Sequence, residues 1–172
     1  MTERLETPRL VLRPLAPGDW PQARAFLLSD RTGGIGGPFT ATQAWILFAA
    51  EVGHWAIHGF GLWAVTRRGD DTAVGVTGPW LPDGWPETEV GWMIYDPDLE
   101  GTGIATEAAR AAIDHAWRVL KWDTVVSYVA PDNTRSSRLA LKLGAVLDED
   151  APQPLPNKRS LVYRHPRPED LA

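Results

Sequence analysis

Three strand-like segments follow one another with only short turns between them, and this arrangement restricts the fold more than any other part of the chain. The segments are 61–67 (GLWAVTR), 72–80 (TAVGVTGPW) and 88–95 (TEVGWMIY). Their connections, 68–71 and 82–86, are too short to hold a crossover helix, so neighbouring strands must run antiparallel. The pattern predicts an antiparallel meander and excludes a regular alternation of strands and helices.

A strand and two helices are expected before the meander. Residues 9–15 alternate in the manner of a strand and end at a Pro-Gly turn. Helices are predicted over 19–29 and 40–59, because each segment begins with a capping residue that is followed three positions later by Gln. Between them, residues 31–39 are so rich in glycine that a mobile loop is expected. The second helix is expected to bury a stripe formed by Trp45, Phe48, Ala49, Val52 and Ala56.

Two further helices and three strands are expected after the meander. An alanine-rich helix over 104–120, a nearly all-apolar strand over 124–130 and a helix over 131–143 follow in turn. Residues 145–147 and 160–165 are predicted to be closing strands. The complete order is β-α-α-β-β-β-α-β-α-β-β. It predicts a mixed α/β (α+β) fold in which one mostly antiparallel sheet is flanked by helices.

Length and composition limit the class of protein. The chain has 172 residues, 44% of them hydrophobic, so one domain over residues 1–172 with a sizeable core is expected. It has no cysteine, which excludes zinc ribbons, iron–sulfur clusters and thiol nucleophiles and suits a reducing cytoplasm. The net charge of −5 makes nucleic acid an unfavourable partner.

A membrane location is not expected either. The N-terminal segment 1–6 (MTERLE) is charged and lacks the apolar region of a signal peptide. No run of 18 apolar residues, the length needed to span a bilayer, occurs in the chain. A cytoplasmic location is therefore the expectation.

A glycine-containing turn connects the last strand of the meander to the alanine-rich helix. In the segment 100–107 (EGTGIATE), the glycines let the first helical amides point outward, where the helix dipole favours an anion. The segment predicts a pyrophosphate site, although a tight turn that binds nothing has the same pattern. A dinucleotide-binding turn would need Gly or Ala at the position of Thr106 and an acid at the end of the next strand, whereas Asp123 precedes that strand. A P-loop is excluded because no Gly-Lys-Ser/Thr follows.

Several segments together resemble one protein family. Residues 7–14 (TPRLVLRP), 101–108 (GTGIATEA), 133–136 (NTRS) and 143–145 (LGA) occur in the order that this family would require. On these segments the chain resembles the GNAT family of acetyl-CoA-dependent N-acetyltransferases, in the branch similar to ribosomal-protein N-terminal alanine acetyltransferases. The resemblance covers nearly the whole chain. It implies acetyl-CoA as co-substrate, no metal, and an amine as acceptor.

The resemblance also implies which residues bind acetyl-CoA. Backbone groups of Met93 and Tyr95 would pair with the pantetheine arm, and Asn133 and Ser136 would contact the same molecule from the later helix. The pyrophosphate would be bound by the glycine turn, at Gly101, Thr102, Gly103, Ile104, Ala105 and Thr106.

One position departs from the family pattern. The family has Gln or Arg at the position of Glu100, and a carboxylate beside a pyrophosphate is unfavourable by simple charge. This substitution bears on affinity for the co-substrate. Arg135 or Arg138 would meet the 3′-phosphate, or both lie on a solvated helix face.

Amine acetylation needs a group that removes a proton and a donor that polarises the acetyl carbonyl. Strand alternation places Glu89 on the same face as Gly91 and Met93, and because the family often carries its base on this strand, Glu89 is the candidate base. An exposed strand carboxylate without a catalytic role is the alternative. Many members of the family carry a tyrosine on the later helix as the general acid that protonates the CoA thiolate, and this chain has Ala140 at the matching position. Proton transfer then rests on Glu89, on water, or on Ser136, which is the candidate side-chain donor to the CoA thiolate.

Other chemically suggestive residues have simpler explanations. Glu107 suits the first turn of a helix, and His54 and His58 have no evident third partner for a metal. Trp45 is expected in the core. Five further tryptophans are expected on the elements that flank the acceptor cleft in this family, namely Trp55, Trp63, Trp80, Trp85 and Trp92.

The leading function is transfer of acetyl from acetyl-CoA to a primary amine, either a protein or peptide N-terminus or a small molecule. One alternative is a catalytically weak acyl-CoA-binding module of the same fold. A nicotinamide-dependent oxidoreductase is the other, and the antiparallel meander and the missing third glycine oppose it. A monomer or a homodimer is expected.

Overall fold

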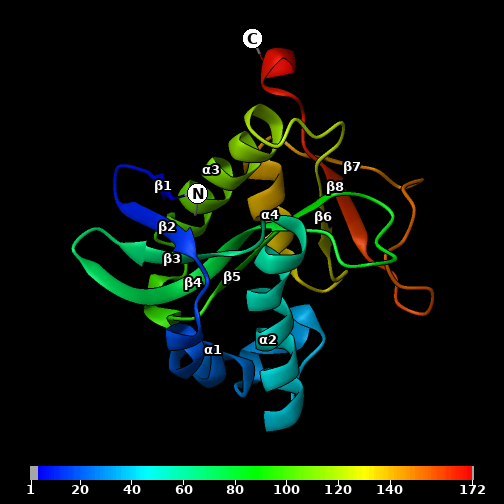
Figure 1. Ribbon diagram of the computed structural model, residues 1–172. Helices are drawn as coiled ribbons and strands as arrows, with labels where there is room; N and C mark the ends of the chain where they lie inside the picture. Colours follow the sequence, from blue (N-terminus) through cyan, green and yellow to red (C-terminus); the bar gives the residue numbers. More distant parts are fainter. Residues whose placement is uncertain (1–3, 172) are drawn as a thin grey trace.

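The computed structural model describes residues 4–171, and within them the strands form one eight-stranded sheet in the order β1-β2-β3-β4-β5-β6-β8-β7 (Figure 1). Every neighbouring pair is antiparallel except β5 and β6, which run parallel. The first half of the charged N-terminal segment, residues 1–3, lies outside the described part. The strands are β1 (Leu5–Glu6), β2 (Leu10–Pro14), β3 (Trp63–Arg67), β4 (Asp70–Trp80), β5 (Glu89–Ile94), β6 (Val126–Val129), β7 (Val146–Leu147) and β8 (Leu161–Arg164).

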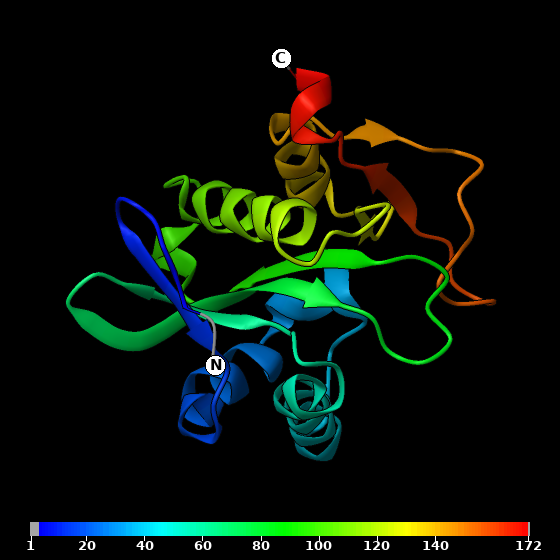
Figure 2. The ribbon, with the colours of Figure 1, turned by 45° about the horizontal axis from the view of Figure 1, so that its top comes forward.

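Helices cover both faces of this sheet. Figure 2 shows the sheet nearly edge-on, with α3 and α4 above it and α1 and α2 below it. The predicted mixed α/β fold and element order are confirmed, and the short strand β1 is an addition. The α-helices are α1 (Trp20–Leu27), α2 (Ala41–His58), α3 (Ile104–Arg118) and α4 (Thr134–Lys142). Short 3₁₀ helices are η1 (Pro17–Asp19), η2 (Asp30–Ile35), η3 (Pro97–Leu99) and η4 (Pro168–Leu171).

Two apolar layers hold these elements together. The layer between the sheet and α3 is built from alanines of the helix, such as Ala109 and Ala112, against Val90 of the central strand β5. Because alanine side chains are short, the helix backbone packs closely on the sheet. The layer on the other face contains Phe26 of α1 and Phe48 of α2.

Helix α2 has the ends that its sequence predicts but not the predicted buried face. Thr40 accepts a hydrogen bond from the Gln43 amide, the Gln43 side chain accepts one from the Thr40 amide, and Gly59 closes the helix with φ of 76°. The expected buried stripe is wrong at three of its five positions, since Trp45 is 58% exposed and Ala49 and Ala56 are also exposed, whereas Phe48 is buried and Val52 is half-buried against the core. The residues that pack inward are Ala44, Phe48, Glu51 and His54.

The carboxylate of Asp19 does not cap α1, although the sequence suggested that it would. It lies within 2.8 Å of both terminal nitrogens of Arg13 and accepts a hydrogen bond from the Ala16 amide. The ion pair joins β2 to the start of α1, so an arginine six residues earlier replaces the helix amides as the partner of Asp19.

The expectation of a mobile loop over 31–39 is also wrong. Residues 30–35 form the 3₁₀ helix η2, which Ser29 caps by accepting from the Arg31 amide. Its Thr32 is fully buried, and the side chain of Arg31 is fixed by contacts described below. Side chains that anchor the segment outweigh the conformational freedom of its glycines.

No helix among residues 4–171 combines the length and the apolar character needed to cross a lipid bilayer.

Candidate active site

Strands β5 and β6 meet at one point and then separate, and this separation creates the candidate site. They are paired at Glu89 and Val126, where the Val126 amide donates to the Thr88 carbonyl. One step further along, the Val90 carbonyl accepts a hydrogen bond of 2.6 Å from the Ser127 side chain instead of one from a backbone amide. The ladder ends here, and the strands diverge toward their carboxyl ends.

A cavity of about 650 Å³ lies against the open side of this gap. It is bounded by η2, the end of β5, the glycine turn and one side of α4. Its lining includes Trp92, Met93, Gly101, Thr106, Asn133 and Ser136. Five of these six residues were predicted to bind the co-substrate, and Trp92 was not.

The glycine turn leads into α3 with the geometry of an anion site. Gly101 and Gly103 have φ of 75° and 84°, a conformation that side chains disfavour. Gly103 caps α3 without a side-chain hydrogen bond, and the first internal bond runs from the Glu107 amide to the Gly103 carbonyl. The amides of residues 104–106 therefore have no helical acceptor. Their number and direction suit a phosphate oxygen.

Two arginines neutralise Glu100, the acidic residue that departs from the family pattern. Arg31 of η2 lies 2.5 Å from one of its oxygens, and Arg135 of α4 forms an ion pair with the other. Arg31 also donates to the carbonyls of Ile94 and Tyr95, at 2.8 and 2.6 Å. The glycine turn thus carries no uncompensated negative charge. Arg31 was not singled out by sequence, because its partners lie about 65 residues away.

The backbone register of β5 corrects one sequence prediction. The Tyr95 amide donates to the Val74 carbonyl of β4, and the Tyr95 carbonyl accepts from Arg31, so the backbone of Tyr95 pairs with β4 and not with the gap. Since hydrogen-bonding directions alternate along a strand, Met93 also faces β4. The backbone groups that face the gap belong to Trp92 and Ile94.

Helix α4 presents Asn133 and Ser136 to the cavity, as expected. Asn133 caps the helix by accepting from the Ser136 amide at 3.1 Å. The hydroxyl of Ser136 accepts a hydrogen bond of 3.3 Å from the indole nitrogen of Trp92. An indole N–H can only donate, so the hydroxyl keeps its own proton for another acceptor.

Glu89 lies at the point where the two strands part. Its carboxylate accepts a hydrogen bond of 2.8 Å from the Trp85 indole and another from the Tyr128 amide. Burial raises the pKa of Glu89 to about 7, against the opposing effect of these two donors. The space beside it is open, because a side chain at Gly91 would meet nothing closer than Glu89 itself at 3.7 Å. The residue has the pKa that a general base near neutral pH requires.

The tryptophans divide into different roles. Trp85 contacts Glu89, whereas Trp63 is fully buried and packs edge-on against Trp55. Trp80 stacks on His54. Only part of the predicted aromatic group therefore reaches the candidate base.

The histidine pair on α2 is structural. His54 is buried, with one ring nitrogen 2.8 Å from the Phe60 carbonyl and the other accepting from the Leu81 amide. His58 stacks on its ring. Among residues 4–171 no three acidic, histidine or cysteine side chains gather as a metal site would require.

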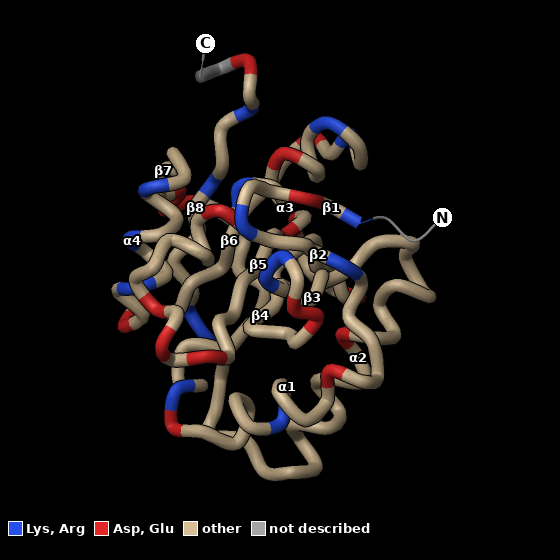
Figure 3. Tube along the Cα trace, turned by 90° about the vertical axis from the view of Figure 1, so that its left-hand side faces the viewer, with Lys and Arg blue, Asp and Glu red and all other residues tan. Residues whose placement is uncertain are grey.

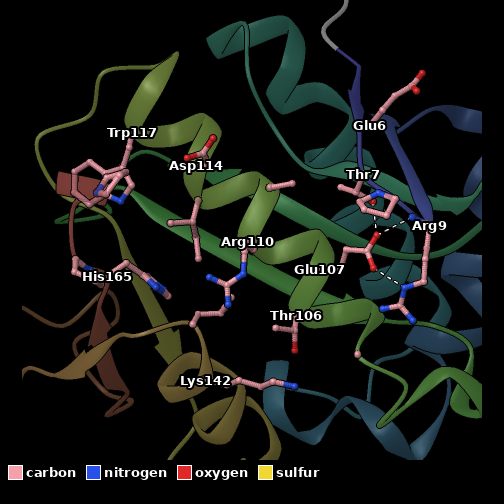
Figure 4. A pocket seen from close by; sticks show the side chains of 17 residues that line it. Glu6, Thr7, Arg9, Thr106, Glu107, Arg110, Asp114, Trp117, Lys142 and His165 are labelled. Carbon is pink, nitrogen blue, oxygen red and sulfur yellow. Dashed lines mark hydrogen bonds and ion pairs between the residues drawn. The ribbon is translucent and has the colours of Figure 1, made fainter. Parts of the chain in front are cut away.

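A second cavity, of about 770 Å³, lies along the outer side of α3 (Figure 4). At one end Glu107 joins α3 to the start of β2, accepting from the Thr7 hydroxyl at 2.6 Å and from Arg9 at 2.6 Å. Burial by itself raises the pKa of Glu107, but these hydrogen bonds lower it by more, so the pKa lies below its ordinary value. The arrangement agrees with a structural role for Glu107. Its lining contains no residue of β5 and neither Asn133 nor Ser136, so it is the poorer candidate for chemistry despite its size.

Comparisons with known proteins show what the chain and its fold are similar to. The family model described as an acetyltransferase (GNAT) domain matches residues 9–146. The crystal structure of an acetyltransferase from Agrobacterium tumefaciens is similar over 97% of this chain and 96% of that one, with 37% identity and a TM-score of 0.90. An uncharacterized N-acetyltransferase of Bacillus subtilis, YnaD, is 29% identical over 56 residues, about a third of either chain.

More distant structures share the fold. The ribosomal L7/L12 alpha-N-protein acetyltransferase RimL is 16% identical, with a TM-score of 0.72 over 95% of this chain and 93% of that one. An acetyltransferase of the GNAT family from Bacillus anthracis is 23% identical, with a TM-score of 0.73 over 94% of this chain and 96% of that one.

Proposed function

The chain belongs to the acetyltransferase (GNAT) family, and we propose that it transfers the acetyl group of acetyl-CoA to the α-amine of a peptide or protein, or to a small amine of similarly low pKa. The observation that carries the proposal is the placement of Glu89 at the closed end of a gap whose open end is the glycine turn. A co-substrate lying in the gap would bring its acyl end to the carboxylate.

The residues around the gap fit acetyl-CoA. The free amides of residues 104–106 would hold the pyrophosphate. The backbone groups of Trp92 and the amide of Ile94 would pair with the pantetheine arm, whereas the Ile94 carbonyl already accepts from Arg31. Asn133 and Ser136 line the same cavity. Bound acetyl-CoA supplies the activated acyl group, and the protein supplies orientation and proton transfer.

Two side chains would handle the protons. Glu89, with a pKa near 7, accepts the proton that the amine loses as its nitrogen bonds to the acetyl carbon. The carbon–sulfur bond breaks, and the Ser136 hydroxyl, oriented by the Trp92 indole, donates to the sulfur. The Trp92 amide faces the gap and would polarise the carbonyl oxygen.

An α-amine suits this equipment better than a lysine side chain. The pKa of an α-amine is near 8 and that of lysine near 10.4, so producing the neutral amine at pH 7 costs about 3 kcal/mol more for lysine. A carboxylate whose pKa is near 7 cannot recover that difference.

No observation favours the alternative of a binding module without turnover. It was motivated by the acidic Glu100, and that charge is compensated by Arg31 and Arg135. The absence of cysteine suits a reducing compartment, so we expect the enzyme to act in the cytoplasm.

The proposal is tested with two matched peptides and mass spectrometry of the products. One peptide has a free N-terminus and an acetylated lysine, and the other has a blocked N-terminus and a free lysine. We expect acetyl-CoA-dependent acetylation of the first peptide. Preferential acetylation of the second would contradict the acceptor assignment, and CoA release without an acetylated amine in any peptide or small-amine panel would contradict amine transfer.

A further inference from the structure

Gly91 is an exception in the middle of the sheet. It lies on β5, which has β4 on one side and β6 on the other, and glycine weakens the interior of a strand. Its register partner on β4, Gly78, is buried, whereas Gly91 is half-buried, so solvent reaches the sheet at this point. A glycine inside a strand often marks a place where a ligand comes close to the backbone.

The open side of Gly91 is the face of the sheet that α1 and α2 cover. Side chains alternate along β5, so that Val90 and Trp92 pack in the layer against α3 and Met93 packs in the layer against α1 and α2. Gly91 therefore faces the second layer, as Glu89 does. Apart from its neighbours in the chain, one atom of residues 4–171 lies within 4 Å of a Cβ built at Gly91, and it is Oε1 of Glu89 at 3.7 Å. We call this space the Gly91 hollow.

The candidate base borders the Gly91 hollow. Trp85 donates to Oε2 of Glu89 at 2.8 Å, and Oε1, the oxygen that Trp85 does not bind, lies on the side of Gly91. An amine nitrogen in the hollow would therefore meet Oε1. The next residue, Trp92, has backbone groups that face the gap between β5 and β6. The hollow thus lies between the candidate base and the expected position of the acetyl group.

The other walls of the Gly91 hollow are apolar. Trp80 is the register partner of Glu89, and both Trp80 and Met93 lie in the layer against α1 and α2. Helix α2 itself has one residue among Asp, Glu, Lys and Arg, which is Glu51, and that side chain is buried (Figure 3). A charged side chain of an acceptor would meet no opposite charge on α2. An uncharged, apolar side chain would instead pack on Trp80 and Met93.

We propose that the Gly91 hollow receives the amine and the first side chain of the acceptor, and that Gly91 determines which first residues fit. The inference rests on the α-amine acceptor proposed above and names its class, a peptide or protein whose first residue carries an apolar side chain such as that of leucine. Any residue other than glycine at position 91 would fill the space that this side chain needs. The glycine weakens β5 and leaves room for the substrate.

Gly91→Ala tests whether the hollow limits the size of the acceptor. Gly91 does not have a positive φ, and 3.7 Å is an ordinary contact distance, so alanine fits the fold and the melting temperature should stay the same or rise. Initial rates at pH 8 are measured with peptides that differ only in their first residue, which is Gly, Leu or Asp. The pKa of the amine is about 8 in all of them, so the chemical step is matched.

The expected result is a change in preference. Wild-type kcat/KM should be roughly tenfold or more higher for the Leu peptide than for the Asp peptide, whose carboxylate would lie near Glu89. In Gly91→Ala, kcat/KM should fall about 10- to 100-fold for the Leu peptide, because the new methyl group overlaps the leucine side chain. It should fall less than about threefold for the Gly peptide, which has no side chain to displace.

The matched control is Gly53→Ala on α2. A Cβ at Gly53 also meets no atom within 4 Å, so the same methyl group is added in open space away from β5. This variant should keep the wild-type order of peptides. Calorimetry should show unchanged affinity for acetyl-CoA in both variants, because the hollow lies on the α1 and α2 side of the sheet and not in the gap.

Four results would overturn the inference. An equal fall in kcat/KM for the Gly and Leu peptides would show that Gly91 does not act through size, and an unchanged order of peptides would place the first residue elsewhere. Lost affinity for acetyl-CoA in Gly91→Ala would assign the hollow to the co-substrate, and a wild-type preference for Asp would refute the apolar class. All four leave wild-type acetylation of peptides intact, whereas a wild-type protein that acetylates none of them refutes the proposed function and this inference with it.

Discussion

Glu89→Gln should separate the chemical role of Glu89 from its effect on the fold. The substitution keeps the size of the side chain and removes its ability to accept a proton. A catalytic base and a bystander carboxylate predict different outcomes for activity but the same outcome for stability. Both properties are therefore measured on one variant.

The stability effect follows from the raised pKa. Burial raises the pKa of Glu89 from 4.5 to about 7 in the folded protein, so the folded state binds the proton more tightly than the unfolded state does. The wild type consequently loses stability as pH rises from about 4.5 through 7, by about 3 kcal/mol at 1.36 kcal/mol per pKa unit. Gln does not ionise and avoids this loss.

A smaller term opposes this gain. Two N–H groups, from the Trp85 indole and the Tyr128 main chain, donate to the carboxylate. Gln has one acceptor oxygen, so one donor loses its partner at a cost of about 1 kcal/mol. The variant should be about 1 kcal/mol less stable than wild type near pH 4.5 and about 2 kcal/mol more stable above pH 8. For a chain of this size the second figure corresponds to a rise in Tm of roughly 4–8 °C.

The activity effect has the opposite sign at neutral pH. The kcat of Glu89→Gln should fall about 100-fold or more, and the rise of wild-type kcat/KM with pH through about 7 should disappear. Thermal melts and initial rates at pH 5 to 9 measure both effects. The control is Glu87→Gln, two residues earlier, whose carboxylate is paired with Arg164 at 2.7 Å and has no proposed chemical role.

Near-full turnover of Glu89→Gln, together with the expected stability change, would refute Glu89 as the base while leaving its buried pKa intact. A variant that loses activity and also melts lower than wild type at pH 8 would refute the linkage argument.

Three further predictions follow from the same site. Acetyl-CoA at 100 times its Kd should stabilise the protein against thermal unfolding by about 2.7 kcal/mol, and NAD should not; equal stabilisation by both ligands would contradict this. Gly103→Val should abolish the stabilisation by acetyl-CoA, because a side chain is disfavoured at φ of 84°. Calorimetry should show that Arg31→Ala weakens acetyl-CoA binding roughly tenfold, because Glu100 is left with one exposed partner. Adding Glu100→Gln to this variant should restore part of the lost affinity, and no restoration would rule out charge as the cause. Trp92→Phe should lower kcat about fivefold with little change in KM, as expected for the loss of one hydrogen bond of about 1 kcal/mol to Ser136. The control is Trp55→Phe, which removes an indole that donates to the Leu62 carbonyl; an equal fall in its kcat would indicate general damage to the fold.

Local sequence patterns predicted the helices and strands but not which face of each is buried. The short turns of the meander and the capping box at Thr40 are local features, and both are present in the structure. The predicted buried face of α2 was wrong at Trp45, Ala49 and Ala56, because apolar side chains occur all around that helix and periodicity alone could not choose between Trp45 and Glu51. Packing against the sheet made that choice.

The candidate site shows the same division. The sequence alone determined the glycine turn, the capped start of α4 and the presence of Glu89 on a strand, because each depends on residues close together in the chain. Only the tertiary structure decided that Arg31 neutralises Glu100, that Trp92 orients Ser136, and that the backbone groups facing the gap belong to Trp92 and Ile94. These depend on which strand pairs with which, on its register, and on contacts between residues 44 to 69 positions apart, and no local pattern specifies them.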